Sequence, residues 1–352
     1  MNAQTGLEWA PDERKTGNPV TLAEVARRAK VSTTTVSRVL NQSALVNPAT
    51  RKVVERAIRE LNFHPNMHAR VLAAGKSRSL GLVVSNLENP FFLDIFRAME
   101  NEAQQHDYDV TVHNTGYNRM RLMAAVQRIL QNRAAGVAII VSEMDPALLD
   151  DLAASQMPTV IYDVGQPGPR ITSIKVNYER GVRKAVEYLY ALGHRRMAFV
   201  GHHPGLKPLQ GRREAFLATM KEYDGRLQFA VAMETDGPAG GQRAARMVLA
   251  NRPRPTAILC ANDFMALGVL GELREQGLAV PGDLSVVGYD NIGLAQFAAP
   301  PLTTLDIPRE AIGRMAFHAL VRDKGAGRAE LPQEWRVEPE LVVRASTAPP
   351  RT

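Results

Sequence analysis

The chain has 352 residues, 45% of them hydrophobic, which is more than one compact core usually holds, so we expect two or three domains. Its single cysteine, Cys260, excludes an internal disulfide, and no segment approaches the ~20 apolar residues of a membrane span. Residues 1–18 are polar, lack the apolar stretch of a signal peptide and read as a disordered extension. We therefore expect a cytoplasmic protein without membrane contact.

The net charge of +7 is concentrated near the N-terminus. Residues 19–78 contain eleven basic and three acidic residues, so the rest of the chain is close to neutral. A compact basic block is typical of a nucleic-acid-binding module. The alternative is a basic face that only contacts solvent.

Residues 19–65 predict a small domain of three helices. Two short helices lie within residues 21–40, and the second runs from Thr33 to Leu40. The third begins at Pro48, behind the capping residue Asn47, and extends to about Leu61. Residues 66–78 then form a linker, of which 66–74 predict one more short helix. An isolated helix of that length is marginal in water.

From residue 79 to 352 short apolar runs alternate with amphipathic helices. This alternation predicts parallel sheets covered on both faces, and the number of strands predicts two lobes, each a doubly wound α/β sheet. A ligand would bind between the lobes, beyond the carboxyl ends of the strands. The predicted strands are 80–85, 110–113, 137–141, 159–162, 196–201, 231–235, 257–260 and 285–288.

The run VTLAEVARRAKVSTTTVSRVLN predicts a helix-turn-helix whose second helix enters the DNA major groove. Thr33, Thr34, Ser37 and Arg38 share the outer side of this helix, where hydroxyls suit phosphates and base edges. Arg38 suits a bidentate contact to guanine. The alternative is a hydroxyl-rich helix that only faces solvent.

The chain resembles the lactose-repressor (LacI) family. The resemblance covers residues 19–345 and rests on several further motifs in the family's order. These are NPATRKVVERAIRELNFHPN, HARVLAAGKSRSLGLVV, FFLDIFRAMENEA, CANDFMALG, DLSVVGYDN and PPLTTL. It implies a helix-turn-helix domain followed by a two-lobed domain like the periplasmic sugar-binding proteins. It also implies a transcriptional repressor that binds a palindromic operator as a homodimer.

The resemblance assigns DNA contacts residue by residue. Thr33 and Thr34 occupy positions that set operator preference, and Leu72 matches a hinge leucine that wedges into a central base step of the minor groove, with Ala69 and Arg70 beside it. The alternative for Leu72 is packing on the larger domain. Five positions match phosphate contacts: Thr21, Ser32, Thr35, Ser37 and Asn41.

The resemblance also implies an effector site in the larger domain. Most members of the family respond to sugars and some to purines, so we expect a sugar or a sugar derivative, while induction and corepression both stay open. Asn177 stands where the family more often has aspartate, and Asp290 has the alternative role of a turn residue. The positions that match effector contacts are Asn89, Phe91, Phe92, Asp163, Asn177, Arg212, Asn262 and Asp290.

Other classes of function have less support. A transported-solute-binding protein has no use for the helix-turn-helix, and an enzyme needs a catalytic constellation, which we do not find. A regulator whose partner is a phosphoprotein stays open. His202-His203 lacks further metal ligands, so we expect neither a metal nor a cofactor.

Overall fold

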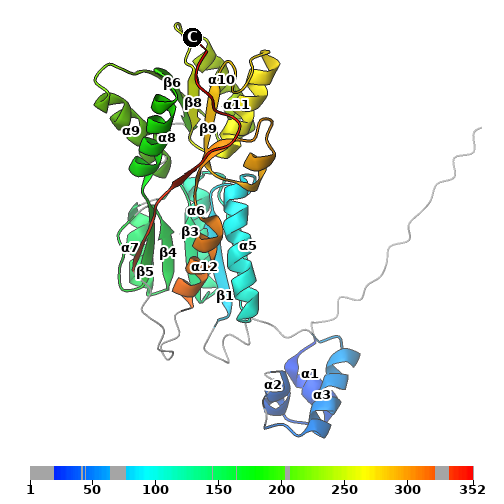
Figure 1. The fold of residues 1–352 in the computed structure, drawn as a ribbon. Coiled ribbons are helices and arrows are strands. Elements are labelled where there is room, and N and C mark those ends of the chain that lie inside the picture. The colour runs from blue at the N-terminus through cyan, green and yellow to red at the C-terminus, as the bar shows by residue number, and fades with distance from the viewer. Residues whose placement is uncertain are drawn as a thin grey trace, which may run out of the picture. The chain divides into compact units, whose positions relative to one another are not determined.

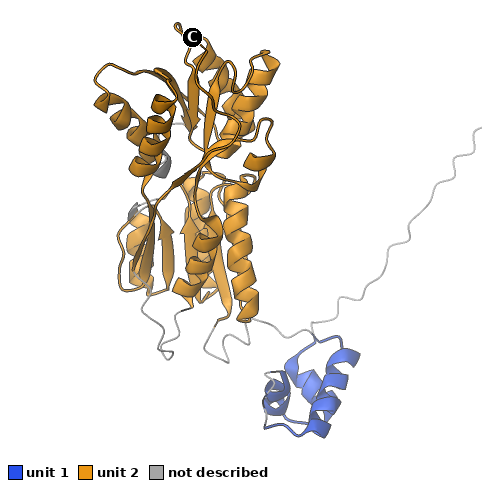
Figure 2. Ribbon diagram, viewed as in Figure 1, with its two compact units in different colours: residues 1–76 blue, residues 77–352 orange. Residues whose placement is uncertain are grey.

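The computed structural model divides into two compact units, residues 1–76 and 77–352 (Figure 2). The structure describes residues 20–40, 43, 45–63, 77–144, 146–163, 165–202, 207–321 and 333–351. The predicted extension 1–18 and residues 66–76 of the predicted hinge therefore lie outside the described part. The boundary between the units falls within the segment 66–78 that the sequence predicts as a connection.

Unit 1 is the predicted three-helix domain. Its helices are α1 (Leu22–Ala29), α2 (Thr33–Leu40) and α3 (Pro48–Glu60). One apolar side chain from each helix is fully buried at the centre, Val25, Val36 and Val54. The helices are short, so this shared core, rather than their intrinsic propensity, holds them together.

Unit 2 contains two six-stranded sheets, one in each lobe (Figure 1). The first has the strand order β11-β5-β4-β3-β1-β2, and the second has the order β12-β10-β9-β8-β6-β7. Neighbouring strands are parallel except for the antiparallel pair β10–β12. The first-lobe strands are β1 (Ser79–Val84), β2 (Asp109–Asn114), β3 (Gly136–Ile140), β4 (Thr159–Tyr162), β5 (Ile171–Val176) and β11 (Glu334–Val337). The second-lobe strands are β6 (Arg196–His202), β7 (Gln228–Glu234), β8 (Ala257–Cys260), β9 (Ser285–Asp290), β10 (Thr303–Asp306) and β12 (Glu340–Val342).

Helices cover the sheets in both lobes (Figure 1). Those of the first lobe are α5 (Pro90–Gln105), α6 (Arg119–Gln131), α7 (Pro146–Ser155) and α12 (Arg309–Leu320). Those of the second lobe are α8 (Tyr178–Ala191), α9 (Lys207–Glu222), α10 (Pro238–Leu249), α11 (Asp263–Glu275) and the short 3-10 helix η1 (Gly293–Phe297). A Cβ at Gly313 of α12 would lie 2.4 Å from the carbonyl oxygen of Ile95, so glycine allows α12 to pack closely on α5.

The chain passes between the lobes at three places, after β5, after β10 and after β11. Such connections permit the lobes to move relative to each other while the sheets stay intact. The predicted fold class is confirmed, and all eight predicted strands are present. Strands β5, β10, β11 and β12 were not predicted.

Candidate functional site

Helix α2 presents a polar face to solvent. Val36 and Val39 are buried against α1 and α3, whereas Thr33, Thr34 and Arg38 are exposed. Arg38 makes no side-chain hydrogen bond or ion pair with the residues described in unit 1. The outer face of this helix is therefore available for DNA, as its sequence predicts.

Several predicted phosphate contacts also cap helices. The hydroxyl of Thr21 accepts a hydrogen bond from the backbone N–H of Glu24 at 3.3 Å, in a capping box. In return, the backbone N–H and the hydroxyl of Thr21 donate to Oε2 of Glu24 at 2.7 and 3.0 Å, which lowers the pKa of Glu24. Ser32 accepts a bond from the N–H of Thr35 at 3.2 Å, and the two hydroxyls lie 2.9 Å apart. These residues thus fix the starts of α1 and α2, and a hydroxyl in such a cap can still meet a phosphate. Ser37 is half-buried on α2. The predicted contacts outside the described residues are Asn41, Ala69, Arg70 and Leu72.

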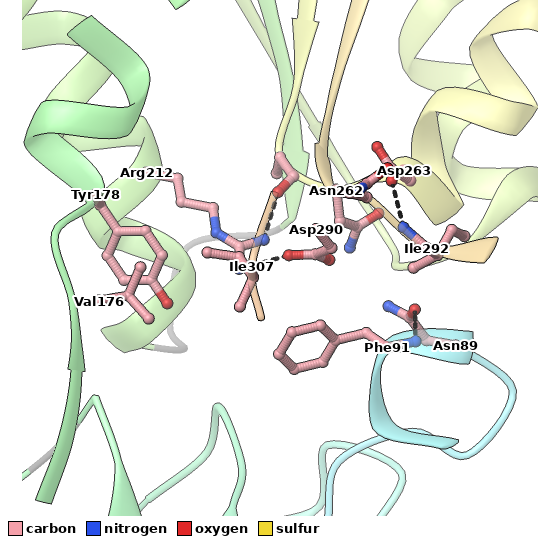
Figure 3. Close-up of polar contacts among 12 residues, drawn as sticks. Asn89, Phe91, Val176, Tyr178, Arg212, Asn262, Asp263, Asp290, Ile292 and Ile307 are labelled. Carbon is pink, nitrogen blue, oxygen red and sulfur yellow. Dashed lines mark hydrogen bonds and ion pairs between the residues drawn. The ribbon is translucent and has the colours of Figure 1, made fainter. Parts of the chain in front are cut away.

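A small cavity lies between the two lobes of unit 2, and six of the eight predicted effector residues line it (Figure 3). Its volume is about 30 Å³, room for one or two water molecules. The lobes are therefore closed on each other in this structure. The lining residues are Asn89, Phe91, Phe92, Tyr117, Ile140, Val141, Ser142, Tyr162, Tyr178, Arg212, Asn262 and Asp290.

Arg212 of α9 is the buried cation of this cavity. Its Nη2 donates to Oδ1 of Asp290 at 3.1 Å, and its Nη1 donates to the carbonyl oxygen of Ala261. The guanidinium carbon lies 5.0 Å from the ring centre of Tyr178 and 4.3 Å from that of Tyr289. Burial disfavours the charge, but Asp290 and the tyrosines outweigh burial and raise the pKa of Arg212.

Asp290 balances that charge at the end of β9. Burial raises the pKa of its carboxyl to about 6, and the nearby Arg212 limits the rise. Its φ of 100° is in the region that side chains rarely adopt. Asp290 thus combines an unusual backbone conformation with a position on the cavity wall, and its ligand role stays a prediction.

Two asparagines at the cavity cap helices. Asn89 accepts a hydrogen bond from the N–H of Phe91 at 3.1 Å, and Asn262 accepts one from Met265 at 2.7 Å. The ring of Phe91 contacts Phe92 and Tyr162 edge-on, at 5.1 and 6.1 Å between centres. The first lobe therefore supplies an aromatic wall to the cavity, and the second supplies its two charged side chains, Arg212 and Asp290.

Asp163 and Asn177 do not line the cavity. Asp163 accepts hydrogen bonds from the N–H of Val176 at 2.7 Å and from the hydroxyl of Tyr178, which does line it. Burial raises the pKa of Asp163 to about 6. Asn177 caps α8 and donates to Glu338 at 3.1 Å, so it joins two of the connections between the lobes.

A second polar cluster joins the lobes directly. We call Asn86, Tyr117, His202, Asp236 and Asn262 the interlobe latch. From the first lobe, Asn86 and the hydroxyl of Tyr117 donate to Asp236 Oδ2 at 3.2 and 2.5 Å. From the second lobe, Asn262 Nδ2 and His202 Nε2 approach Asp236 Oδ1 at 3.0 and 2.9 Å. Burial would raise the pKa of Asp236, but the contacts with His202 and Tyr117 outweigh it and hold the pKa well below its usual range.

The sequence did not predict this cluster or the tyrosines at the cavity. Tyr162 ends a buried strand and Tyr178 begins a helix, so each also fits a residue of the hydrophobic core. The sequence signal for these tyrosines is their position directly beside Asp163 and Asn177, two predicted effector residues.

Among the residues that the structure describes, no three His, Cys, Asp or Glu side chains could together hold a metal ion. No helix in the described ranges is long and apolar enough to cross a membrane.

Comparison with known proteins identifies both units. Residues 21–66 match the model for bacterial regulatory proteins of the lacI family, and residues 186–347 match a periplasmic binding protein-like domain. The chain is 34% identical over 340 residues to the HTH-type transcriptional repressor PurR of Photobacterium profundum, covering 93% of this chain and 98% of that protein. The chain belongs to the LacI family. It is a DNA-binding transcriptional repressor, and its relatives of this kind are not enzymes.

Solved structures of LacI-family proteins share the fold. The lac repressor dimer bound to operator and the anti-inducer ONPF has a TM-score of 0.79 and 31% identity, covering 94% of this chain and 100% of that one. A complex of the regulator CelR with cellobiose has a TM-score of 0.63 and 31% identity, covering 93% of this chain and 99% of that one.

Proposed function

We propose that this LacI-family repressor binds a palindromic operator as a homodimer and that a small molecule bound between its lobes controls the affinity. The observation that carries the effector site is the buried Arg212–Asp290 pair in the interlobe cavity. A charged pair costs desolvation free energy, so its burial beside a cavity favours a binding role. The operator dimer of the related lac repressor supports the DNA half of the proposal.

The effector we propose is a sugar or a sugar derivative. Arg212, Asn262 and Asp290 converge on the cavity with donors and acceptors that suit hydroxyl groups. The aromatic wall around Phe91 suits the apolar face of a sugar ring, and the related CelR forms a complex with cellobiose. The same wall favours a planar nucleobase as the second candidate.

Binding of either ligand requires the lobes to open, because the cavity now holds only one or two waters. Opening would break the two hydrogen bonds that Asn86 and Tyr117 make to Asp236. A ligand that reaches across the cavity would favour closure again. An effector can change the affinity for DNA only if the effector itself binds the open and the closed arrangements of the lobes with different affinities. We propose that the segment around Leu72 transmits the difference to unit 1.

Calorimetry with ribose, cellobiose, hypoxanthine and guanine tests the site. We expect one of the four to bind the wild type and to change its affinity for a DNA duplex selected from a random library. Arg212→Ala should abolish both effects and leave the duplex affinity without ligand unchanged. Arg195→Ala is the matched control, because Arg195 also stacks on a tyrosine ring, at 3.9 Å from Tyr190, but away from the cavity. A normal response in Arg212→Ala would contradict the proposed site, and failure of all four ligands would contradict both effector classes.

A further inference from the structure

The outer face of α3 carries three basic side chains that follow the helix period. Lys52, Arg56 and Arg59 are separated by four and three residues, so they form one stripe along the helix. All three are exposed. The stripe lies opposite the buried Val54 and Ala57, which face the core of unit 1. We call these three residues the α3 stripe.

Two other basic residues of the unit have intramolecular partners. Arg28 pairs with Glu60, and Arg51 donates to the carbonyl oxygen of Ser43 at 2.9 Å. The side chains of the α3 stripe make no hydrogen bond or ion pair with any residue that the structure describes. Like charges three and four residues apart destabilise a helix. The stripe therefore presents three positive charges that no described side chain pairs with, which points to an anionic partner.

Helix α2 needs additional cations to bind DNA tightly. Its exposed face offers hydroxyls and a single cation, Arg38. Neutralisation of phosphates supplies most of the sequence-independent affinity for DNA. The α3 stripe gathers three such cations on one helix face of the same unit.

We propose that Lys52, Arg56 and Arg59 form a sequence-independent contact to the phosphates of duplex DNA, separate from the face of α2 that reads bases. This proposal rests on DNA binding by unit 1 as proposed above. Lys52 and Arg59 are seven residues apart, or ~10 Å along a helix axis. That length matches about three phosphates of one strand, spaced 3.4 Å along the duplex axis. Lysine and arginine are the side chains that pair with phosphate oxygens.

The test measures the salt dependence of binding to a random-sequence 30-bp duplex by the full chain. We expect the triple variant Lys52→Gln/Arg56→Gln/Arg59→Gln to reduce the slope of log K against log salt by about 2 to 3, at ~0.9 per lost phosphate contact. Affinity for a selected operator duplex should fall in parallel, so that the ratio of specific to non-specific binding is unchanged. The double variant Arg56→Lys/Arg59→Lys should keep the wild-type slope. Glutamine preserves helix propensity, and circular dichroism checks the fold.

The matched control is Arg128→Gln/Lys221→Gln/Arg274→Gln, which removes one lysine and two arginines from exposed positions of unit 2. It changes the net charge by the same amount, so it should leave the slope unchanged if the α3 stripe acts locally. If the triple variant loses helix, Arg56→Gln alone should still lower the slope by about 1. A wild-type slope in the stripe variant, or an equal loss in the control, would overturn the proposal while leaving DNA binding by α2 intact. A wild type that binds no duplex would contradict the proposed function as well.

Discussion

We propose that base recognition by unit 1 depends most on Arg38. Its side chain is exposed on α2 and is held by no described neighbour, so it is free to reach a guanine edge. The nearby hydroxyls of Thr33 and Thr34 are shorter and less directional. We therefore expect one arginine to contribute more to specificity than the threonines around it.

Replacing Arg38 by alanine tests that role. We expect binding to a selected operator duplex to weaken by ~1–3 kcal/mol and preference at one base pair to relax. Fluorescence anisotropy with a set of single-base-pair substitutions measures both effects. Arg27→Ala, an exposed arginine on α1, should leave the base preference unchanged. A wild-type preference profile in Arg38→Ala would contradict the assignment.

At the same scale, the sequence predicted Arg212, Asn262 and Asp290 at the interlobe cavity but not the tyrosines there. Arg212, Asn262 and Asp290 follow strands or lie in motifs, where a polar residue in an apolar context stands out. Tyr117 and Tyr178 do not stand out, because an aromatic side chain next to an apolar run also fits the core. Asn177 was expected at the site and instead caps α8, since capping and ligand binding favour the same residue type at a helix start.

At the scale of elements, two of the four strands that were missed contain buried polar residues. Strand β5 includes Thr172 and Ser173, and β10 includes Thr303 and Thr304, all of them buried. The hydroxyls of Thr303 and Thr304 find partners in the tertiary structure. Thr304, for example, donates to Asp263 at 2.6 Å. A pattern of apolar residues alone cannot reveal such strands, because the partners are distant in the sequence.

One prediction at the scale of elements concerns the predicted hinge helix around Leu72. A short helix that forms only on DNA contributes to specific binding and little to non-specific binding. Leu72→Ala should therefore weaken binding to a selected operator duplex by roughly 10-fold or more, while affinity for a random duplex changes little. Gel-shift titrations with both duplexes measure the ratio. Leu93→Ala, at an exposed leucine of α5, serves as control, and an unchanged ratio for Leu72→Ala would favour packing of Leu72 on the larger domain.

At the scale of the whole molecule, we propose that the interlobe latch favours the closed arrangement of the lobes, because two of its hydrogen bonds join them. Tyr117→Phe combined with Asn86→Ala removes both first-lobe donors to Asp236. We expect the double variant to populate the open arrangement. Spin labels at Arg128→Cys and Lys221→Cys, one in each lobe, should then report a longer and broader distance distribution. Tyr108→Phe, which alters a tyrosine packed on Phe317, should not change it. An unchanged distribution in the double variant would contradict the latch.

The buried carboxyl of Asp263 makes unit 2 sensitive to alkaline pH. Burial and the nearby charge of Asp290 raise its pKa to about 8, although Thr304 and the N–H of Ile292 donate to it. The folded chain therefore keeps a proton between pH 7 and 8 that the unfolded chain has already lost. The free energy of unfolding falls as the pH rises wherever the folded state binds more protons than the unfolded state. Asp236, whose pKa is lowered, is ionised in both states at these pH values and does not contribute.

We expect the free energy of unfolding of residues 77–352 to fall by about 1 kcal/mol from pH 7 to pH 8. Asp263→Asn should flatten this dependence, because the amide does not titrate. Asp283→Asn, at a surface carboxylate that pairs with Arg351, should keep the wild-type slope. Urea unfolding of the full chain at several pH values, followed by tryptophan fluorescence, measures all three proteins. Stability that rises between pH 7 and 8 in the wild type would show that Asp263 is ionised in the folded protein.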